Sequence, residues 1–193
     1  MSDPRRSVQA RSISFDFDGV LSSLVLGKRW AKTRRKKAPI PLVSPVVRAL
    51  KVGVESFTER LRKPYPHAAE TLERLRTAGL TLYVLTSRAD ERIAAAERWL
   101  DRRGWRGSFE RLFFNVDGED ADAFKAGILQ AHPVDIHVDD DPGTIAHLAP
   151  LFPDMLFVHL DHERGRSPRG ANIVAVRDWP ELAALFGVKP TPL

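Results

Sequence analysis

The stretch SISFDFDGV, residues 12–20, decides the fold. Residues 12–17 form a short, apolar, β-prone run that breaks at Gly19. Side chains two positions apart in an extended chain point the same way, so Asp16 and Asp18 would project together from the strand end. The stretch therefore predicts a buried strand that presents two carboxylates at its carboxyl end.

Strand and helix signals alternate along the rest of the chain. Further short apolar runs, continuous rather than alternating, lie at residues 80–86, 111–115, 135–138, 155–160 and 173–176. Helical signals lie between and after them, at residues 66–79, 91–103, 121–132, 142–151 and 179–186. This order predicts an α/β fold, a Rossmann-like parallel sheet with helices on both faces, in which ligands bind at the carboxyl ends of the strands.

Local signals predict where the first two of these helices begin and end. Pro66 suits a first helical position, Ala69 would lie on the buried stripe, and Gly79 would end the helix. Asp90 is the expected N-cap of the next helix, which Gly104 would end.

One segment interrupts the alternation. Residues 21–63 contain no convincing strand signal: a basic run, GKRWAKTRRKKAPIP, is followed by apolar residues with helical spacing at positions 47, 50, 54, 57 and 61. We therefore expect an α/β core formed by residues 1–20 and 64–193. Residues 21–63 would be a small, basic, helical insertion after the first strand, placed like a cap over the strand ends.

Composition excludes several classes of protein. The 193 residues include no cysteine, which excludes a disulfide scaffold, a cysteine-ligated metal site and thiol catalysis. The longest stretch without a charged side chain, residues 142–153, is much shorter than the roughly 20 residues of a transmembrane helix. No apolar signal region begins the sequence, so we expect a cytoplasmic protein with no transmembrane segment.

Positive charge is concentrated in the insertion. The formal net charge is +5, yet the stretch from Lys28 to Lys63 alone contains twelve basic and two acidic residues, so the rest of the chain is acidic. Such asymmetry indicates an anionic partner for one segment. A phosphorylated substrate, a nucleic acid and an anionic membrane surface all remain open, as does a simple solvated basic loop.

A second group of carboxylates follows the predicted strand at residues 135–138. The carboxyl end of this strand would carry Asp139, Asp140 and Asp141. The start of the next helix explains Asp141 but neither of the other two acids. If this strand neighbours the first, Asp16 and Asp18 converge with these acids, and such a concentration of buried charge needs a cation. Oxygen ligands of this kind suit Mg²⁺. The alternative is a set of solvated acids at strand ends.

Two more elements fit the same site by their order in the chain. Thr86 ends the second predicted strand, where its hydroxyl would donate to a phosphoryl oxygen, although Ser and Thr also serve as turn residues there. Lys125, near the start of a helix, would balance the acids, although a lone lysine is more often solvated. Arg88 closely follows Thr86 and could approach a substrate, but we favour a surface salt bridge for it. His137 lacks the spacing of a ligand.

Taken in order, these residues resemble the four motifs of the haloacid dehalogenase (HAD) superfamily of phosphohydrolases. The first motif is DFDGV at residues 16–20, the second Thr86, the third Lys125 and the fourth Asp139-Asp140. The resemblance covers residues 12–20 and 64–160 and does not extend to the insertion. It implies a Mg²⁺-dependent phosphatase that hydrolyses a phosphomonoester.

The resemblance also implies a role for each motif residue. Asp16 would be the nucleophile that forms an aspartyl-phosphate, and Asp18 the general acid and base, with an Asp at this position favouring phosphatase over dehalogenase chemistry. Thr86 and Lys125 would stabilise the phosphoryl group. The implied metal contacts are Asp16, Asp18 through its backbone carbonyl, and Asp140, with Asp139 acting directly or through water.

Two other functions remain open at this point. A phosphotransferase or phosphomutase would use the same aspartyl-phosphate. A non-catalytic module would bind nucleic acid or an anionic membrane through the basic insertion, but the joint presence of Asp16, Asp18, Thr86, Lys125 and Asp140 argues against it.

Overall fold

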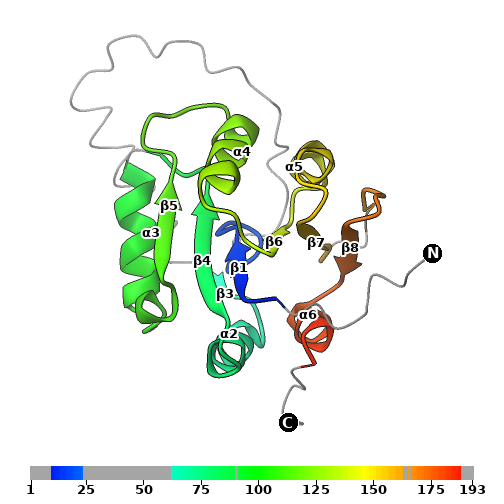
Figure 1. Ribbon diagram of the computed structural model, residues 1–193. Helices are drawn as coiled ribbons and strands as arrows, with labels where there is room; N and C mark the ends of the chain where they lie inside the picture. Colours follow the sequence, from blue (N-terminus) through cyan, green and yellow to red (C-terminus); the bar gives the residue numbers. More distant parts are fainter. Residues whose placement is uncertain (1–9, 24–61, 90, 163–164, 166, 188–193) are drawn as a thin grey trace.

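The computed structural model describes residues 10–23, 62–89, 91–162, 165 and 167–187. Its centre is a six-stranded sheet in the order β5-β4-β1-β6-β7-β8, in which every neighbouring pair is parallel (Figure 1). The strands are β1 (Ser12–Phe15), β4 (Thr81–Thr86), β5 (Arg111–Phe114), β6 (Ile136–Asp139), β7 (Leu156–Leu160) and β8 (Ile173–Val176). The predicted parallel α/β fold is confirmed.

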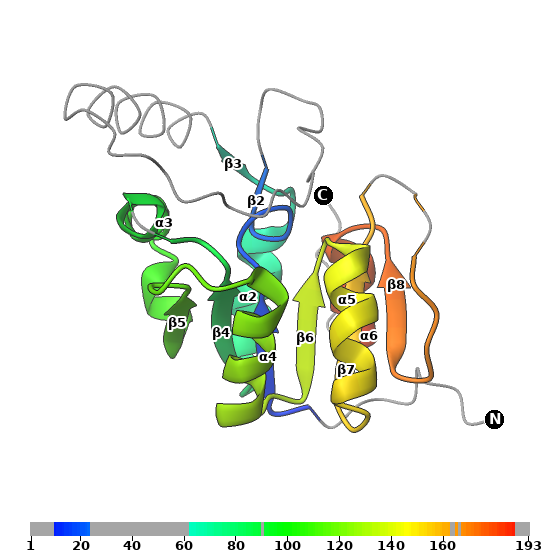
Figure 2. The same ribbon diagram turned by 90° about the horizontal axis from the view of Figure 1, so that it is seen from above.

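Helices cover both faces of this sheet, as expected. One face packs against α2 (Ala68–Thr77), α3 (Glu91–Asp101) and α6 (Trp179–Leu185), and the other against α4 (Ala121–Ala131) and α5 (Pro142–Leu148) (Figure 2). Two short 3-10 helices, η1 (Arg106–Ser108) and η2 (Ala149–Leu151), follow α3 and α5. Each face therefore has its own hydrophobic core, and the larger one lies under α2, α3 and α6.

Aromatic side chains in the larger core fix the loop that follows β1. Phe15 stacks on Trp179 of α6 with ring centroids 5.6 Å apart, and Phe17 meets Trp99 of α3 edge to face at 5.2 Å. The Trp179 indole Nε1 donates a hydrogen bond to the Val20 carbonyl over 3.1 Å. These contacts hold the FDFDGV stretch between two helices and the sheet.

The predicted start of α2 needs a correction. α2 begins at Ala68, two residues after Pro66, because His67 adopts a left-handed conformation (φ 64°) as its N-cap. This shift buries Ala68 in place of the expected Ala69, which is exposed. Gly79 follows the end of α2 with a φ of +87°, a conformation that glycine adopts without strain, as its predicted role requires.

The base of the insertion contains a small second sheet that sequence analysis missed. β2 (Ser22–Ser23) and β3 (Lys63–Pro64) pair antiparallel, and two-residue strands carry no recognisable sequence pattern. Figure 2 shows this pair beyond the carboxyl end of the central strands. The predicted helix in the insertion and the proposed N-cap Asp90 lie outside the described residues.

Among the residues that the structure describes, no helix has both the length and the apolar character needed to cross a bilayer.

Candidate active site

The site lies at the carboxyl ends of β1 and β6, which are neighbours in the sheet. Asp16 directly follows β1, and its backbone N–H donates to the Val138 carbonyl over 2.9 Å, which continues the ladder between the two strands. Asp139 is the last residue of β6, and Asp140 follows it. The sequence predicts that these acids converge if the two strands are neighbours, and the structure confirms that they are.

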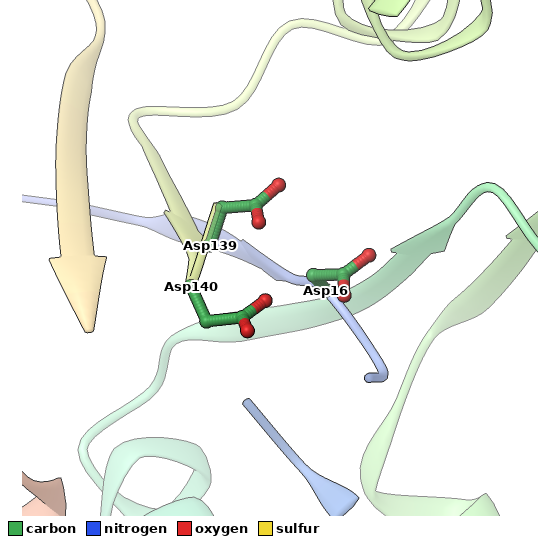
Figure 3. Close-up of side chains that lie close together, drawn as sticks. All are labelled: Asp16, Asp139 and Asp140. Atoms are coloured by element: carbon green, nitrogen blue, oxygen red, sulfur yellow. The ribbon is translucent and has the colours of Figure 1, made fainter. Parts of the chain in front are cut away.

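Three carboxylates converge at this point (Figure 3). Oxygen atoms of Asp16, Asp139 and Asp140 lie within 4.8 Å of one another, and both Asp16 and Asp139 are buried. Asp140 packs against Gly19, whose φ is +83°; a Cβ atom placed there would lie 2.0 Å from the Asp140 Oδ2. Gly19 therefore gives the loop its turn and also leaves room for Asp140.

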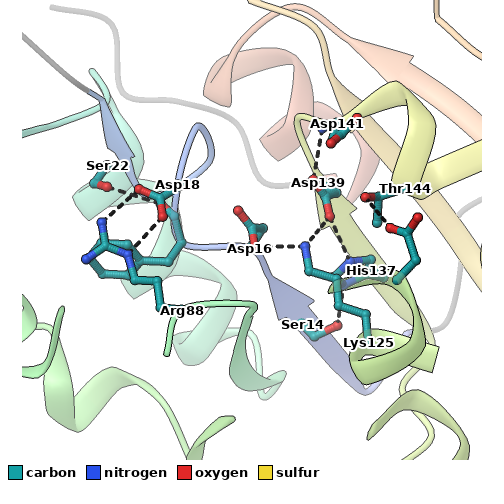
Figure 4. A network of polar contacts seen from close by, with 12 residues as sticks. Ser14, Asp16, Asp18, Ser22, Arg88, Lys125, His137, Asp139, Asp141 and Thr144 are labelled. Carbon is teal, nitrogen blue, oxygen red and sulfur yellow. Dashed lines mark hydrogen bonds and ion pairs between the residues drawn. The ribbon is translucent and has the colours of Figure 1, made fainter. Parts of the chain in front are cut away.

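Lys125 of α4 bridges two of these acids (Figure 4). Its Nζ donates to Asp16 Oδ1 over 2.8 Å and to Asp139 Oδ2 over 2.5 Å, and the lysine is itself buried. Asp120 caps the N-terminus of α4 by accepting hydrogen bonds from the next turn, which fixes the helix that carries Lys125. Burial opposes the charged amine, but the charges of Asp139 and Asp16 raise the pKa of Lys125 well above its ordinary value.

The two buried partners of Lys125 respond in opposite directions. Burial is the largest influence on Asp16 and, with the nearby charges of Asp139 and Asp18, raises its pKa to about 6 despite Lys125. Burial also disfavours ionised Asp139, but Lys125 and His137 outweigh it and hold the pKa of Asp139 well below its ordinary value. The folded protein therefore disfavours ionisation of Asp16 and favours ionisation of Asp139.

His137 supports Asp139 from within β6. Its Nε2 lies 3.4 Å from Asp139 Oδ2, and its Nδ1 lies 2.8 Å from the Ser14 hydroxyl on β1. The Asp141 backbone N–H donates to the other oxygen, Asp139 Oδ1, over 2.9 Å. Burial lowers the pKa of His137, which favours the neutral ring. His137 lacks ligand spacing in the sequence, but residues two apart in a strand point to the same side, and this places His137 beside Asp139.

Asp18 lies outside the three-carboxylate cluster. Arg88 donates from Nε to Asp18 Oδ2 and from Nη2 to Asp18 Oδ1, each over 2.8 Å (Figure 4). Arg62 Nη1 lies 2.5 Å from the same Oδ1. Burial disfavours the ionised carboxylate, but Arg88 and then Arg62 lower the pKa of Asp18 to about 2. The Asp18 carboxylate thus faces guanidinium groups, and its metal and acid–base roles stay predictions.

Arg88 is not the surface residue that the sequence suggested. It is 2% exposed, and its guanidinium lies over the Phe17 ring, 4.4 Å from the centroid. The salt bridge itself exists, but it is formed with Asp18, 70 residues away in the sequence. No local pattern in the sequence signals a pairing across that separation.

Thr86 occupies the position expected of it. It is the last residue of β4, which pairs with β1 on the side opposite β6, and it is buried. The structure therefore brings the carboxyl ends of β4, β1 and β6 together, while the contact of the Thr86 hydroxyl with a phosphoryl group stays a prediction.

The three-carboxylate cluster fits a divalent cation such as Mg²⁺. Its donors are carboxylate oxygens alone, which is the ligand type that Mg²⁺ prefers. When all three acids are ionised, the single charge of Lys125 leaves the cluster with excess negative charge in a buried setting. Asp16, Asp139 and Asp140 are thus the carboxylates that would hold the ion.

A known sequence is similar to part of this chain. No family model matches the chain. An 85-residue segment, 44% of the chain, is 28% identical to a Bacillus cereus protein described as a "Putative nucleotidase", and the match spans 43% of that relative.

Comparison with solved structures identifies the fold. A haloacid dehalogenase-like hydrolase from Streptococcus pneumoniae matches with a TM-score of 0.62 and 15% identity, over 92% of this chain and 98% of that one. YfnB from Bacillus subtilis, described as a "putative HAD-hydrolase" bound to magnesium, matches with a TM-score of 0.66 and 11% identity, over 94% of this chain and 100% of that one. An L-2-haloacid dehalogenase matches with a TM-score of 0.61 and 14% identity, over 93% of this chain and 100% of that one. The chain therefore has the fold of the haloacid dehalogenase-like hydrolases, which its four motifs predict.

Proposed function

We propose that this protein is a Mg²⁺-dependent phosphatase that hydrolyses a phosphomonoester through an aspartyl-phosphate on Asp16. The observation that carries the proposal is the convergence of Asp16, Asp139, Asp140 and Lys125 at the ends of two adjacent parallel strands. Within this fold the solved neighbours include both phosphatases and dehalogenases, so the fold alone does not decide the reaction. The Asp at position 18 favours phosphatase chemistry.

In the first half of the reaction, an oxygen of Asp16 attacks phosphorus and the bond from phosphorus to the leaving oxygen breaks. Lys125 holds Asp16 in place through Oδ1 and stabilises negative charge that develops beside it. A divalent cation held by Asp16, Asp139 and Asp140 would neutralise part of the negative charge of the carboxylate and the phosphate. Thr86 would donate a hydrogen bond to a phosphoryl oxygen.

Asp18 carries the proton in both halves of the reaction. It protonates the leaving oxygen and then accepts a proton from the water that attacks phosphorus, which breaks the bond to Asp16 and releases phosphate. A carboxylate with a pKa of about 2 is ionised at neutral pH, so Asp18 donates a proton only after it leaves Arg88 and Arg62. The pairing seen here is thus a resting arrangement of Asp18.

A generic aryl phosphate tests the proposal. We expect the wild-type protein to hydrolyse it, EDTA to abolish the activity and added Mg²⁺ to restore it, while Asp16→Asn reduces the rate at least 1000-fold. The same preparations are offered a 2-haloacid, and halide release is measured. Phosphatase activity that survives in Asp16→Asn or in EDTA, or halide release without phosphate release, would refute the proposal.

A further inference from the structure

The surroundings of Asp18 have the form of an anion-binding site. Arg88 presents two parallel N–H groups to both carboxylate oxygens, and Arg62 adds a third contact. A guanidinium binds a phosphate or an external carboxylate with this same fork geometry. The side chain of Asp18 therefore occupies a position that a ligand's anionic group would also fit.

Three arginines surround the Asp18 carboxylate. Three guanidinium groups, those of Arg88, Arg62 and Arg92, act on this one carboxylate and lower its pKa. Arg92 lies in the first turn of α3 and is exposed to solvent.

Contacts that do not involve Asp18 hold the two closer arginines in place. The Arg88 guanidinium packs on the Phe17 ring, and its Nη1 lies 3.5 Å from the Arg92 carbonyl. The Arg62 guanidinium donates from Nη1 to the Ser22 hydroxyl over 3.1 Å, and the Arg62 backbone carbonyl accepts hydrogen bonds from Trp99 Nε1 over 3.2 Å and from Arg103 Nη2 over 2.8 Å. The fork would therefore keep its position when Asp18 rotates away, and such preorganisation favours binding.

Solvent reaches the site through Asp18 itself. The Asp18 side chain is 38% exposed, whereas those of Arg62 and Arg88 are 12% and 2% exposed. The carboxylate thus lies on the outer side of the guanidinium groups. Rotation of this one side chain would open them to an incoming anion.

The distance to the nucleophile suits a single small substrate. Asp18 is two residues from Asp16, and two residues span at most about 7 Å even when fully extended. The Asp18 charge also raises the pKa of Asp16, so the two carboxylates are near enough to interact. A substrate whose phosphate lies at Asp16 would reach the arginines with a second anionic group a short distance from the first.

We propose that Arg62 and Arg88, with Arg92 beside them, bind a second phosphate or a carboxylate of the substrate in place of the Asp18 side chain. The proposal rests on the proposed function, because it takes the scissile phosphate to lie at Asp16. It defines the substrate class as phosphomonoesters with a second anionic group near the scissile one. It also couples recognition to catalysis, since the anion that takes the arginines releases Asp18 toward the leaving oxygen.

Matched pairs of substrates test this inference. Glycerol 3-phosphate and 3-phosphoglycerate differ by a carboxylate, and a nucleoside 5′-monophosphate and its 3′,5′-bisphosphate differ by a phosphate. We expect the wild-type protein to prefer the doubly anionic member of at least one pair in kcat/KM, and the pair that responds identifies the second group. Arg62→Gln and Arg88→Lys should lower that preference about 10- to 100-fold, the loss expected for a charge-assisted hydrogen bond.

Arg98→Gln is the control, because Arg98 is an exposed arginine in the last turn of α3 and should leave the preference unchanged. Arg88 is buried, so Arg62→Gln decides the matter if Arg88→Lys does not fold. Equal kcat/KM within both pairs, or a preference that both arginine variants retain, would overturn the inference.

A binding measurement separates failure of this inference from failure of the proposed function. If no phosphomonoester is hydrolysed, the proposed function fails, and calorimetric titration of 3-phosphoglycerate and the nucleoside bisphosphate still reports on the arginines. Binding that weakens at least 10-fold in Arg62→Gln but not in Arg98→Gln supports the second anion site. Binding that is absent, or equal in both variants, contradicts it.

Discussion

In metal-free protein, we predict that replacing the nucleophile candidate, Asp16→Asn, increases the free energy of unfolding at alkaline pH. Burial and neighbouring acids raise the pKa of Asp16 to about 6 from an ordinary value of 3.8, so the folded state disfavours its ionised form. A shift of about two pKa units corresponds to about 3 kcal/mol. Asparagine has nearly the same shape without the charge, so the variant should regain most of that free energy.

The pH dependence follows from the direction of the shift. Well below pH 3.8, Asp16 is protonated in both the folded and the unfolded protein, and its ionisation has no effect on stability. Between about pH 4 and 6 the folded state binds more protons than the unfolded state, so wild-type stability falls with rising pH. We therefore expect the stability gain of Asp16→Asn to be near zero at pH 4 and to reach about 3 kcal/mol by pH 8.

Asp139→Asn is the matched control, because it makes the same chemical change on the other partner of Lys125. The pKa of Asp139 is held below its ordinary value, so ionised Asp139 stabilises the fold above about pH 4, and this contribution is lost as pH falls further. Breaking a buried ion pair costs about 3–5 kcal/mol. Asp139→Asn should therefore destabilise the protein at pH 8, and the loss should shrink under acid conditions.

Urea unfolding with EDTA, followed by tryptophan fluorescence at pH 8, at pH 4 and at lower pH, measures both changes. Trp99 and Trp179 are fully buried in the larger core and will report its exposure. Opposite signs at pH 8 for the two substitutions are the expected result. If Asp16→Asn destabilises the protein as much as Asp139→Asn does, burial does not dominate at Asp16 and the electrostatic account of the cluster is wrong.

Two further predictions concern activity. Gly19→Ala would place a Cβ atom 2.0 Å from Asp140 Oδ2 and should raise the Mg²⁺ concentration for half-maximal activity at least 10-fold. Gly79→Ala imposes a similar positive φ in open space, so it should cost about 1–2 kcal/mol of stability and leave the metal requirement unchanged; equal metal requirements in both variants would contradict the role given to Gly19. Thr86→Val replaces a buried hydroxyl with a methyl group and should lower kcat/KM for an aryl phosphate about 10- to 100-fold, whereas an unaltered kcat/KM would exclude Thr86 from the site.

The central sheet was predictable because its signals are local. Short apolar runs and the glycines at positions 79 and 104 gave strand and helix positions to within a few residues, and alternation gave the parallel arrangement. The start of α2 was less predictable, because the left-handed His67 displaces it from Pro66. β2 and β3 were missed because two residues are too few to show a pattern.

At the candidate site, residues that follow strands were easier to predict than their partners. Asp16 and Asp139 were brought together by strand order alone, since parallel strands end at one edge. The ion pairs of Asp18 with Arg88 and Arg62 were not predictable, because they depend on side-chain rotation and on contacts 70 and 44 residues apart.

The short antiparallel pair β2–β3 has a consequence for how this protein can diverge. It joins Ser22–Ser23 to Lys63–Pro64, so the chain leaves and re-enters the core at one place, beside Asp18. The entropic cost of closing a flexible connection grows only by about 0.6 kcal/mol for each doubling of its length, so this pair of strands could hold the ends of connections of very different lengths. Selection can therefore change the chain between these two strands while the carboxylates that we assign to catalysis stay as they are.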